Sequence, residues 1–391
     1  MASPLSGTLS GVAWSRTRPR RALATALVFT AWVCLAPRAW FGCQAARWYE
    51  GKPTARAPLA ERVRAAVEER DDALFYHSGQ ARFDGQSAVA IYQMTLLGLG
   101  QLIEEQPELR ERYLPAMRLA AHRLVDPKTL DYARRVYGAH GVVAMAPGAG
   151  HAYLGYINLG LGMLRKHDPS TDLAALHDRL TARLATRLFA SPTGMIETYP
   201  GETWPPDVAA VAGSIGLHAE ATGSDASEKL RTWATRFETC AVTQQKGSGY
   251  LAQRLVTGSC RAKDAPRGSG TAVAAYFISF AAPALSSKLY QSVQQQSATF
   301  LGFGGVREYA PGFSGKGDTN AGPILFGISV GATGFAIGAA RAHGDRNGFT
   351  TLARTALLFG APTATADGER FAVGGALGDA LLLAMLTARR R

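Results

Sequence analysis

The acidic and aromatic segment GMIETYPGETWPPDVA carries the residues best suited to proton transfer. It places Glu197, Glu202 and Asp207 within eleven residues, together with Tyr199 and Trp204. Three prolines stiffen the segment, and the last two stand where the first turn of a helix tolerates proline. A rigid loop that combines carboxylates with aromatic rings suits substrate positioning and general acid/base catalysis. The alternative is a loop with a purely structural role.

Two further segments place reactive side chains just before predicted apolar helices. GKGDTNAGPILFGIS contains Asp318 and Asn320, and GAGHAYLGYINLG contains His151, Tyr153 and Tyr156. A carboxyl group buried at such a place could have a raised pKa and act as an acid. The alternatives are structural roles: an aspartate at such a position often caps a helix, and a single histidine is usually structural.

Asp84 and Arg267 precede two other predicted apolar helices in the same way. The catalytic candidates are Asp207, Glu197, Asp318 and Tyr156, and the substrate-binding candidates are Tyr153, His151, Tyr199, Glu202, Trp204, Arg267, Asn320 and Asp84. The chain contains no HExxH, CxxC, P-loop, GxSxG or dinucleotide motif. We therefore expect a small-molecule substrate, with neither a metal nor another cofactor.

These candidates share one place in the predicted architecture. Two kinds of helix alternate along the chain: amphipathic helices such as PELRERYLPAMRLAAHRL, and glycine-containing helices that are apolar on every face, such as AYLGYINLGLGML. A helix that is apolar all round is buried, and close packing would compensate for its glycines. The predicted helices span 59–71, 86–105, 108–124, 150–166, 171–190, 207–222, 225–240, 268–282, 284–299, 321–343, 346–359 and 373–388.

Six inner and six outer helices in alternation predict an all-α (α/α)6 toroid, in which the inner helices begin at one common mouth. Each helix start offers free backbone amides and a partial positive charge. The rival interpretation, a protein that crosses a membrane many times, is disfavoured because the amphipathic helices carry many charges and several apolar runs are shorter than a span requires.

The N-terminus predicts contact with a membrane. Arg16, Arg18, Arg20 and Arg21 precede an apolar run from Ala22 to Ala36, an order that leaves the arginines in the cytoplasm and exports the rest of the chain. An uncleaved anchor is favoured over a cleaved signal peptide because no clear cleavage site comes after the run. The predicted organisation is a basic cytoplasmic terminus (1–21), an anchor or signal segment (22–41), a linker (42–57) and the toroid (58–391). The predicted location is the inner membrane, with the toroid on the periplasmic side; cleavage and secretion are the alternative.

Charge and cysteine content bear on nucleic-acid binding and on disulfide formation. The net charge is +12, but residues 71–388 carry 28 Lys and Arg against 26 Asp and Glu. A nucleic-acid-binding protein needs a clustered basic face on its folded domain, so nucleic acid is not expected as a partner. Cys240 and Cys260 are the only cysteines of the body. In an exported protein they are candidates for a disulfide, and two unrelated buried thiols are the alternative.

GYINLGLGMLRKH, GMIETYPGETWPPDVAAVAGSIGLHAEATGSD and GDTNAGPILFGISVGATGFAIGAARAHGD resemble the linalool dehydratase/isomerase superfamily. The resemblance, over residues 85–360, implies an (α/α)6 toroid and cofactor-independent hydration and dehydration of a monoterpene alcohol. It places Glu197 or Thr198 and Asp207 near the family's active-site cysteines, which this chain lacks. Tyr156 stands where the family carries a histidine. Carboxylates and a phenol could still transfer protons.

These observations lead to a membrane-anchored, exported lyase or isomerase that uses acid/base carboxylates on a small alcohol-type substrate. One alternative is a carbohydrate-active toroid that acts on envelope glycans, since paired carboxylates and aromatic platforms suit that chemistry. Another is a non-catalytic envelope protein built on the same fold. A homo-oligomer is left open.

Overall fold

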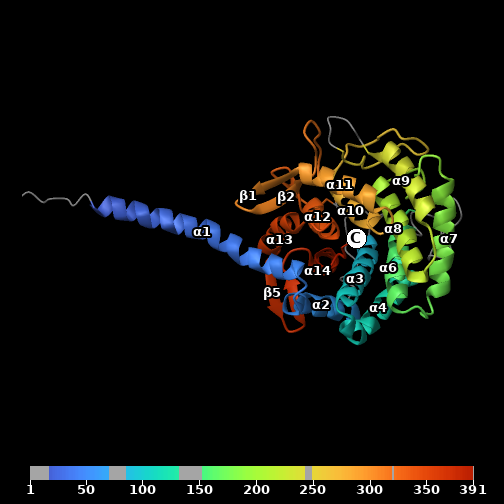
Figure 1. The fold of residues 1–391 in the computed structure, drawn as a ribbon, viewed down its shortest axis with the longest axis horizontal. Coiled ribbons are helices and arrows are strands. Elements are labelled where there is room, and N and C mark those ends of the chain that lie inside the picture. Colours follow the sequence, from blue (N-terminus) through green and yellow to red (C-terminus); the bar gives the residue numbers. More distant parts are fainter. Residues whose placement is uncertain (1–16, 70–84, 132–151, 243–248, 319–320, 391) are drawn as a thin grey trace, which may run out of the picture.

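The structure, a computed structural model, describes residues 17–69, 85–131, 152–242, 249–318 and 321–390. Within these residues the chain is mostly helical, with 13 α-helices, a short 3-10 helix (Pro107–Leu109) and two small antiparallel sheets (Figure 1). The helical prediction is confirmed in this coarser form, and the short strands are an addition that it did not include. His151, Asp84 and Asn320 lie outside the described residues.

The apolar helices form the buried set. Most of their side chains lie in the hydrophobic core; in the first of them, for example, every residue from Ile91 to Ile103 is buried. The members of this set are α3 (Gln86–Glu105), α6 (Leu154–His167), α8 (Pro205–Thr222), α10 (Gly268–Ile278), α12 (Val330–Ala342) and α14 (Gly375–Leu386).

The amphipathic helices bury one face each and alternate with the apolar set along the chain. They are α2 (Pro53–Glu68), α4 (Arg110–Leu124), α7 (Ala174–Ala190), α9 (Ser227–Ala241), α11 (Pro283–Gln295) and α13 (Arg346–Gly360). Most predicted boundaries agree with the structure to within a few residues. The helix predicted over 321–343 begins only at Val330, because residues 324–325 and 328–329 form strands.

The six apolar helices pack against one another in chain order. α3 contacts α6, α6 contacts α8, α8 contacts α10, α10 contacts α12, α12 contacts α14, and α14 contacts α3. Glycines allow the close approaches, as predicted. A Cβ atom on Gly155 of α6 would lie 2.6 Å from the backbone nitrogen of Val211 on α8. Since real side chains do not tolerate such a distance, only glycine fits at this crossing.

The strands lie between the last helices. β1 (Ser297–Phe300), β2 (Phe303–Arg307), β3 (Ile324–Leu325) and β4 (Ile328–Ser329) form one sheet in the order β1-β2-β4-β3, and β5 (Pro362–Thr365) pairs with β6 (Gly368–Phe371). Val306 pairs with Ser329, so the β1–β2 turn and the β3–β4 turn lie at opposite ends of the first sheet.

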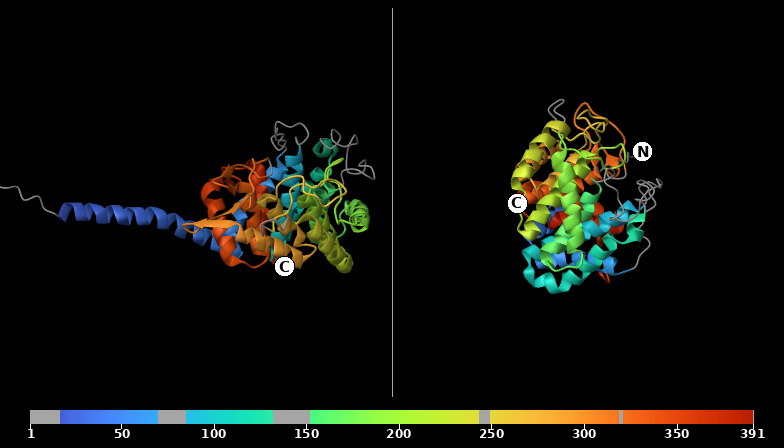
Figure 2. Two further views of the ribbon diagram at one scale, coloured as in Figure 1. Left: turned by 90° about the horizontal axis from the view of Figure 1, so that it is seen from above. Right: turned by 90° about the vertical axis from the view of Figure 1, so that its right-hand side faces the viewer.

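α1 (Thr17–Tyr49) projects from the helical body, as the left view of Figure 2 shows. Among the described residues it is the one helix long and apolar enough to cross a membrane, over Ala22–Tyr49. The apolar side chains in its N-terminal part are exposed; Trp32, for example, is 67% exposed. Ala45, Trp48 and Tyr49 near its C-terminal end are buried in the core. Residues 42–57, predicted as a linker, are instead largely helical: α1 continues to Tyr49 and α2 begins at Pro53.

Candidate acid/base site

The first turns of α6 and α8 bring a phenol and a carboxyl group together. Tyr156 lies in the first turn of α6, and Asp207 lies in the first turn of α8, directly after Pro205 and Pro206. The Tyr156 hydroxyl donates a hydrogen bond to Oδ1 of Asp207 over 2.5 Å. Both residues are partly buried, so the pair lies at the edge of the packed core.

The surroundings of this pair raise the pKa of both groups. Burial raises the pKa of Asp207 to about 6, because the charged form loses hydration, although hydrogen bonds from Tyr156 and Thr198 act in the opposite direction. Desolvation and the charge of Asp207 hold the pKa of Tyr156 well above its usual value, so the phenol stays protonated. The N-cap position of α8 belongs to Trp204, so Asp207 does not serve as the cap of its helix. The carboxyl group can therefore release or accept a proton near neutral pH.

Tyr199 and Gln86 extend this group toward α3. Nε2 of Gln86, the first residue of α3, donates a hydrogen bond to the Tyr199 hydroxyl over 3.4 Å. Tyr199 is buried and close enough to Tyr156 to raise the pKa of that phenol. Tyr153, which precedes α6, is also buried. Three of the predicted aromatic candidates thus lie in, beside or just before the first turn of α6: Tyr156, Tyr199 and Tyr153.

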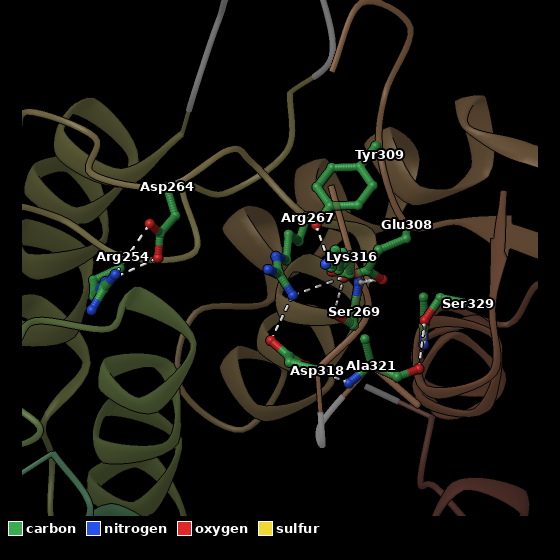
Figure 3. Close-up of polar contacts among 11 residues, drawn as sticks. Arg254, Asp264, Arg267, Ser269, Glu308, Tyr309, Lys316, Asp318, Ala321 and Ser329 are labelled. Carbon is green, nitrogen blue, oxygen red and sulfur yellow. Dashed lines mark hydrogen bonds and ion pairs between the residues drawn. The ribbon is translucent and has the colours of Figure 1, made fainter. Parts of the chain in front are cut away.

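A second polar cluster lies at the start of α10 (Figure 3). Nη1 of Arg267 donates to Oδ2 of Asp318 over 2.5 Å, and the guanidinium lies 5.5 Å from the centroid of the Tyr309 ring. The other carboxyl oxygen of Asp318 accepts the backbone N–H of Ala321. Asp318 therefore stabilises a turn and pairs with an arginine, whereas Ser329 caps α12.

Glu308 is a fully buried carboxylate in the same cluster, and our sequence analysis missed it. Its Oε1 accepts the Ser269 hydroxyl over 2.7 Å, and its Oε2 accepts the Ser269 backbone N–H over 3.2 Å. Nη1 of Arg267 lies 3.8 Å from Oε1. Desolvation raises the pKa of Glu308, while the serines and Arg267 oppose that shift. The helix dipole at the start of α10 also favours an anion there.

The two clusters occupy the same end of neighbouring helices. A Cβ atom on Gly270, in the first turn of α10, would lie 2.9 Å from Cγ of Pro206 in the first turn of α8. Glu308 in turn reaches Ser329, the residue before α12. Together with the Gln86 contact, these packing relations bring the starts of α3, α6, α8, α10 and α12 to one end of the helical body.

Trp204 is the N-cap residue of α8, and other side chains contact its ring. Its indole N–H donates to Oε2 of Glu202 over 3.0 Å, and the Arg254 guanidinium lies 5.4 Å from the Trp204 ring centroid. Arg254 also forms two hydrogen bonds to Asp264, at 2.9 and 3.2 Å. The Arg254 guanidinium therefore occupies one face of this ring, which a stacked sugar could not also use.

Glu197 interacts with residues outside both clusters. Its backbone carbonyl accepts the N–H of Ala152, which ties the loop to the start of α6. Its carboxylate interacts electrostatically with Arg187 on α7. Of the catalytic candidates, the structure thus joins Asp207 to Tyr156, places Asp318 with Arg267, and brings Glu197 within electrostatic reach of Arg187 on α7.

Cys240 and Cys260 form a disulfide, with an S–S distance of 2.06 Å. The bond joins the last turn of α9 to the loop that leads to Arg267, and it confirms the candidate pairing. A disulfide together with an apolar N-terminal helix fits an extracytoplasmic body behind a signal or anchor segment.

No protein-family model matches the chain, and no curated protein matches it. Within the described residues, one group of His, Cys, Asp and Glu side chains could hold a metal ion: His177, Asp178 and His218. This group lies at the other end of α8, and our sequence analysis missed it. His177 and His218 stand 41 positions apart, so no local spacing rule reveals them.

Proposed function

We propose that this chain is a cofactor-independent lyase or isomerase that transfers protons to and from a small alcohol-type substrate through Asp207 and Tyr156. The observation that carries the proposal is the 2.5 Å hydrogen bond between these partly exposed side chains. It joins a carboxyl group whose pKa lies near neutrality to a phenol that stays protonated. General acid/base catalysis is most efficient when the pKa of the catalytic group lies near the working pH.

In the dehydration direction, the proposed steps use only these groups and the substrate. Protonated Asp207 gives its proton to the substrate hydroxyl, directly or through Tyr156. The C–O bond breaks and water leaves, so a carbocation forms. A proton on the neighbouring carbon then returns to the carboxylate, which forms the alkene and regenerates the acid. Hydration follows the same steps in reverse, and an isomerisation adds water back at a different carbon.

The proposed framework is an (α/α)6 toroid. Its support is the closed order in which α3, α6, α8, α10, α12 and α14 contact one another, together with one amphipathic helix between each successive pair. In that architecture the gathered helix starts line a common mouth. The three segments that resemble the linalool dehydratase/isomerase superfamily support the same fold and a terpenoid alcohol as substrate.

The proposed location is the inner membrane, with the helical body on the periplasmic side. Besides α1 and the disulfide, the β1–β2 turn supports this location. Phe300 and Leu301 at its tip are 77% and 45% exposed, and Leu301 adopts a φ of 50°, which strains a non-glycine residue. A Cβ atom on Gly302 would lie 2.8 Å from Nε of Arg38 on α1. The apolar tip thus lies where the apolar part of α1 ends.

The test is a product assay with the full chain in detergent or vesicles. Linalool, geraniol and myrcene are incubated with the protein, and the products are analysed by gas chromatography. We expect a terpenoid product, a rate that falls about 100-fold or more in Asp207→Asn, and a partial loss in Tyr156→Phe.

The matched control is Asp172→Asn, an exposed aspartate before α7, which should leave the rate unchanged. Product formation that survives Asp207→Asn would show that this pair is not the proton-transfer group. A folded wild-type chain that yields no product from any of the three substrates would contradict the terpenoid assignment.

A further inference from the structure

A second cluster of reactive side chains lies where α7 begins and α8 ends. His177 and Asp178 stand in the first turn and a half of α7, and His218 stands in the last turn and a half of α8. Asp207 is eleven residues earlier on α8, so the cluster lies about 17 Å along the helix from the acid/base pair. It belongs to neither polar cluster at the helix starts.

The three side chains converge. One potential ligand atom from each of them lies within 4.8 Å of the other two. Nε2 of His218 lies 2.8 Å from Oδ1 of Asp178, and the two imidazole rings are 4.8 Å apart between centroids at an interplanar angle of 61°. A tetrahedral zinc ion bound at about 2.0–2.1 Å sets its ligand atoms roughly 3.4 Å apart. Small side-chain rotations would therefore close the group around one ion.

The burial and hydrogen bonding of His177 provide independent evidence for a ligand. Its side chain is 1% exposed, and neither ring nitrogen has a hydrogen-bond partner among the described residues. The ring also packs against α6 at Gly162, where an added Cβ atom would lie 3.3 Å from Nε2. A buried imidazole without a partner is unfavourable, and such a group needs an explanation such as an ion.

We propose that His177, Asp178 and His218 bind one divalent transition-metal ion, with Zn²⁺ as the cognate ion. Imidazole nitrogens suit zinc, and carboxylate oxygen is its other common protein ligand. The side chain of Asp178 is 50% exposed, so the fourth coordination position is open to water. The ion would join α7 to α8 at the end of the helical body remote from Asp207, and it would use both histidines of the cluster.

Arg165 is the one charged neighbour that opposes cation binding in the described cluster. Its Nη1 donates to Oδ1 of Asp178 over 3.0 Å and to the backbone carbonyl of Ala174 over 2.9 Å. The guanidinium therefore competes with an ion for the carboxylate. If the site binds a metal, Arg165→Gln removes a repelling charge and frees Asp178. This gives the proposal a variant that should bind metal more tightly.

The experiment is zinc titration calorimetry on the full chain, purified without a histidine tag and stripped with a chelator. We expect one Zn²⁺ per chain, at least tenfold weaker binding in His177→Gln and in His218→Gln, and tighter binding in Arg165→Gln. Cobalt as the probe should show a visible absorption spectrum that is lost in the same two variants. Zinc should also raise the melting temperature of the wild type but not that of His218→Gln.

The matched control is His122→Gln. His122 lies on α4 with its Nε2 3.3 Å from Oδ1 of Asp172, so it forms a histidine–aspartate pair that, among the described residues, is not part of a cluster of three potential ligands. Its loss should leave zinc binding unchanged. Circular dichroism checks that each variant is folded, and the more exposed His218 serves if His177→Gln does not fold. A folded wild type that binds no zinc, or zinc affinity that is equal in His218→Gln and His122→Gln, would overturn the proposal.

Discussion

The Tyr156 hydroxyl donates a 2.5 Å hydrogen bond to the Asp207 carboxylate from the first turn of the neighbouring helix. The bond favours the charged carboxylate, whereas the surrounding protein disfavours it, and burial is the larger effect. The balance leaves an ionisable group near neutrality at the end of the body where the apolar helices begin.

The first prediction concerns stability against pH. Because the folded-state pKa of Asp207 is about 6 against 3.8 for an ordinary aspartate, the folded chain binds this proton more tightly than the unfolded chain. The charge therefore lowers stability above pH 6, and that penalty disappears as the pH falls. Between pH 7.5 and 4.5 the wild type should gain up to about 2 kcal/mol relative to Asp207→Asn.

Urea unfolding of the detergent-solubilised chain at several pH values measures this difference. Tyr156→Phe removes a hydrogen bond that lowers the pKa of Asp207, so it should move the transition to higher pH. Asp172→Asn should leave the wild-type pH profile unchanged. Parallel stability curves for the wild type and Asp207→Asn would show that the pKa of Asp207 is not raised.

The second prediction concerns Arg267 and its two carboxylates. Arg267→Met leaves the fully buried Glu308 without its nearest cation, so it should lower the free energy of unfolding by about 3 kcal/mol or more. Asp318→Asn should cost about 1 kcal/mol or less, because the Asp318 side chain is 34% exposed and such pairs contribute little.

The double variant Arg267→Met, Glu308→Gln tests whether the unpaired charge of Glu308 causes this loss of stability. It should recover part of the loss because the unpaired charge is gone. Chemical denaturation of the wild type, Arg267→Met, Glu308→Gln and the double variant measures the coupling between the two residues. Equal stabilities of Arg267→Met and the double variant would show that Glu308 does not depend on Arg267.

The third prediction concerns the disulfide. Cys240 and Cys260 are 20 residues apart, and a crosslink across a loop of this length stabilises a protein by about 3 kcal/mol. Cys240→Ala with Cys260→Ala should lower the free energy of unfolding by that amount. Reductant should destabilise the wild type but not the double variant. Cys43→Ser, at the exposed free cysteine, is the control and should behave as the wild type in both conditions.

The fourth prediction concerns the β1–β2 turn. In a Cys34→Ser, Cys43→Ser background, an environment-sensitive fluorophore on Phe300→Cys should report an apolar surrounding in vesicles and be quenched by a lipid-borne quencher. Phe326→Cys is the matched control, because Phe326 is an exposed phenylalanine in a similar turn at the opposite end of the sheet. Equal quenching at the two positions would contradict contact between the Phe300 turn and the bilayer.

Local sequence patterns predict most of the helices here, because helix formation and burial depend on side chains within a few positions. The alternation of apolar and amphipathic segments located the twelve α-helices that follow α1 in the described part of the chain, and the apolar stretch after Arg21 located α1. Glycines within apolar helices predicted close packing, which Gly155 illustrates against Val211. The pattern missed all six strands of the described residues, since strands of two to five residues carry few side chains from which a period could be recognised.

The pairings that carry chemistry depend on how distant segments pack. Tyr156 and Asp207 are 51 residues apart, and Ser269 and Glu308 are 39 apart. No local pattern states which helix starts become neighbours, so Glu197 and Asp207 were equivalent candidates in the sequence. Helix packing placed Glu197 where its charge interacts with that of Arg187 on α7, and it brought Asp207 into a hydrogen bond with Tyr156. Burial, which sets the pKa of each carboxyl group, likewise exists only after the helices have packed.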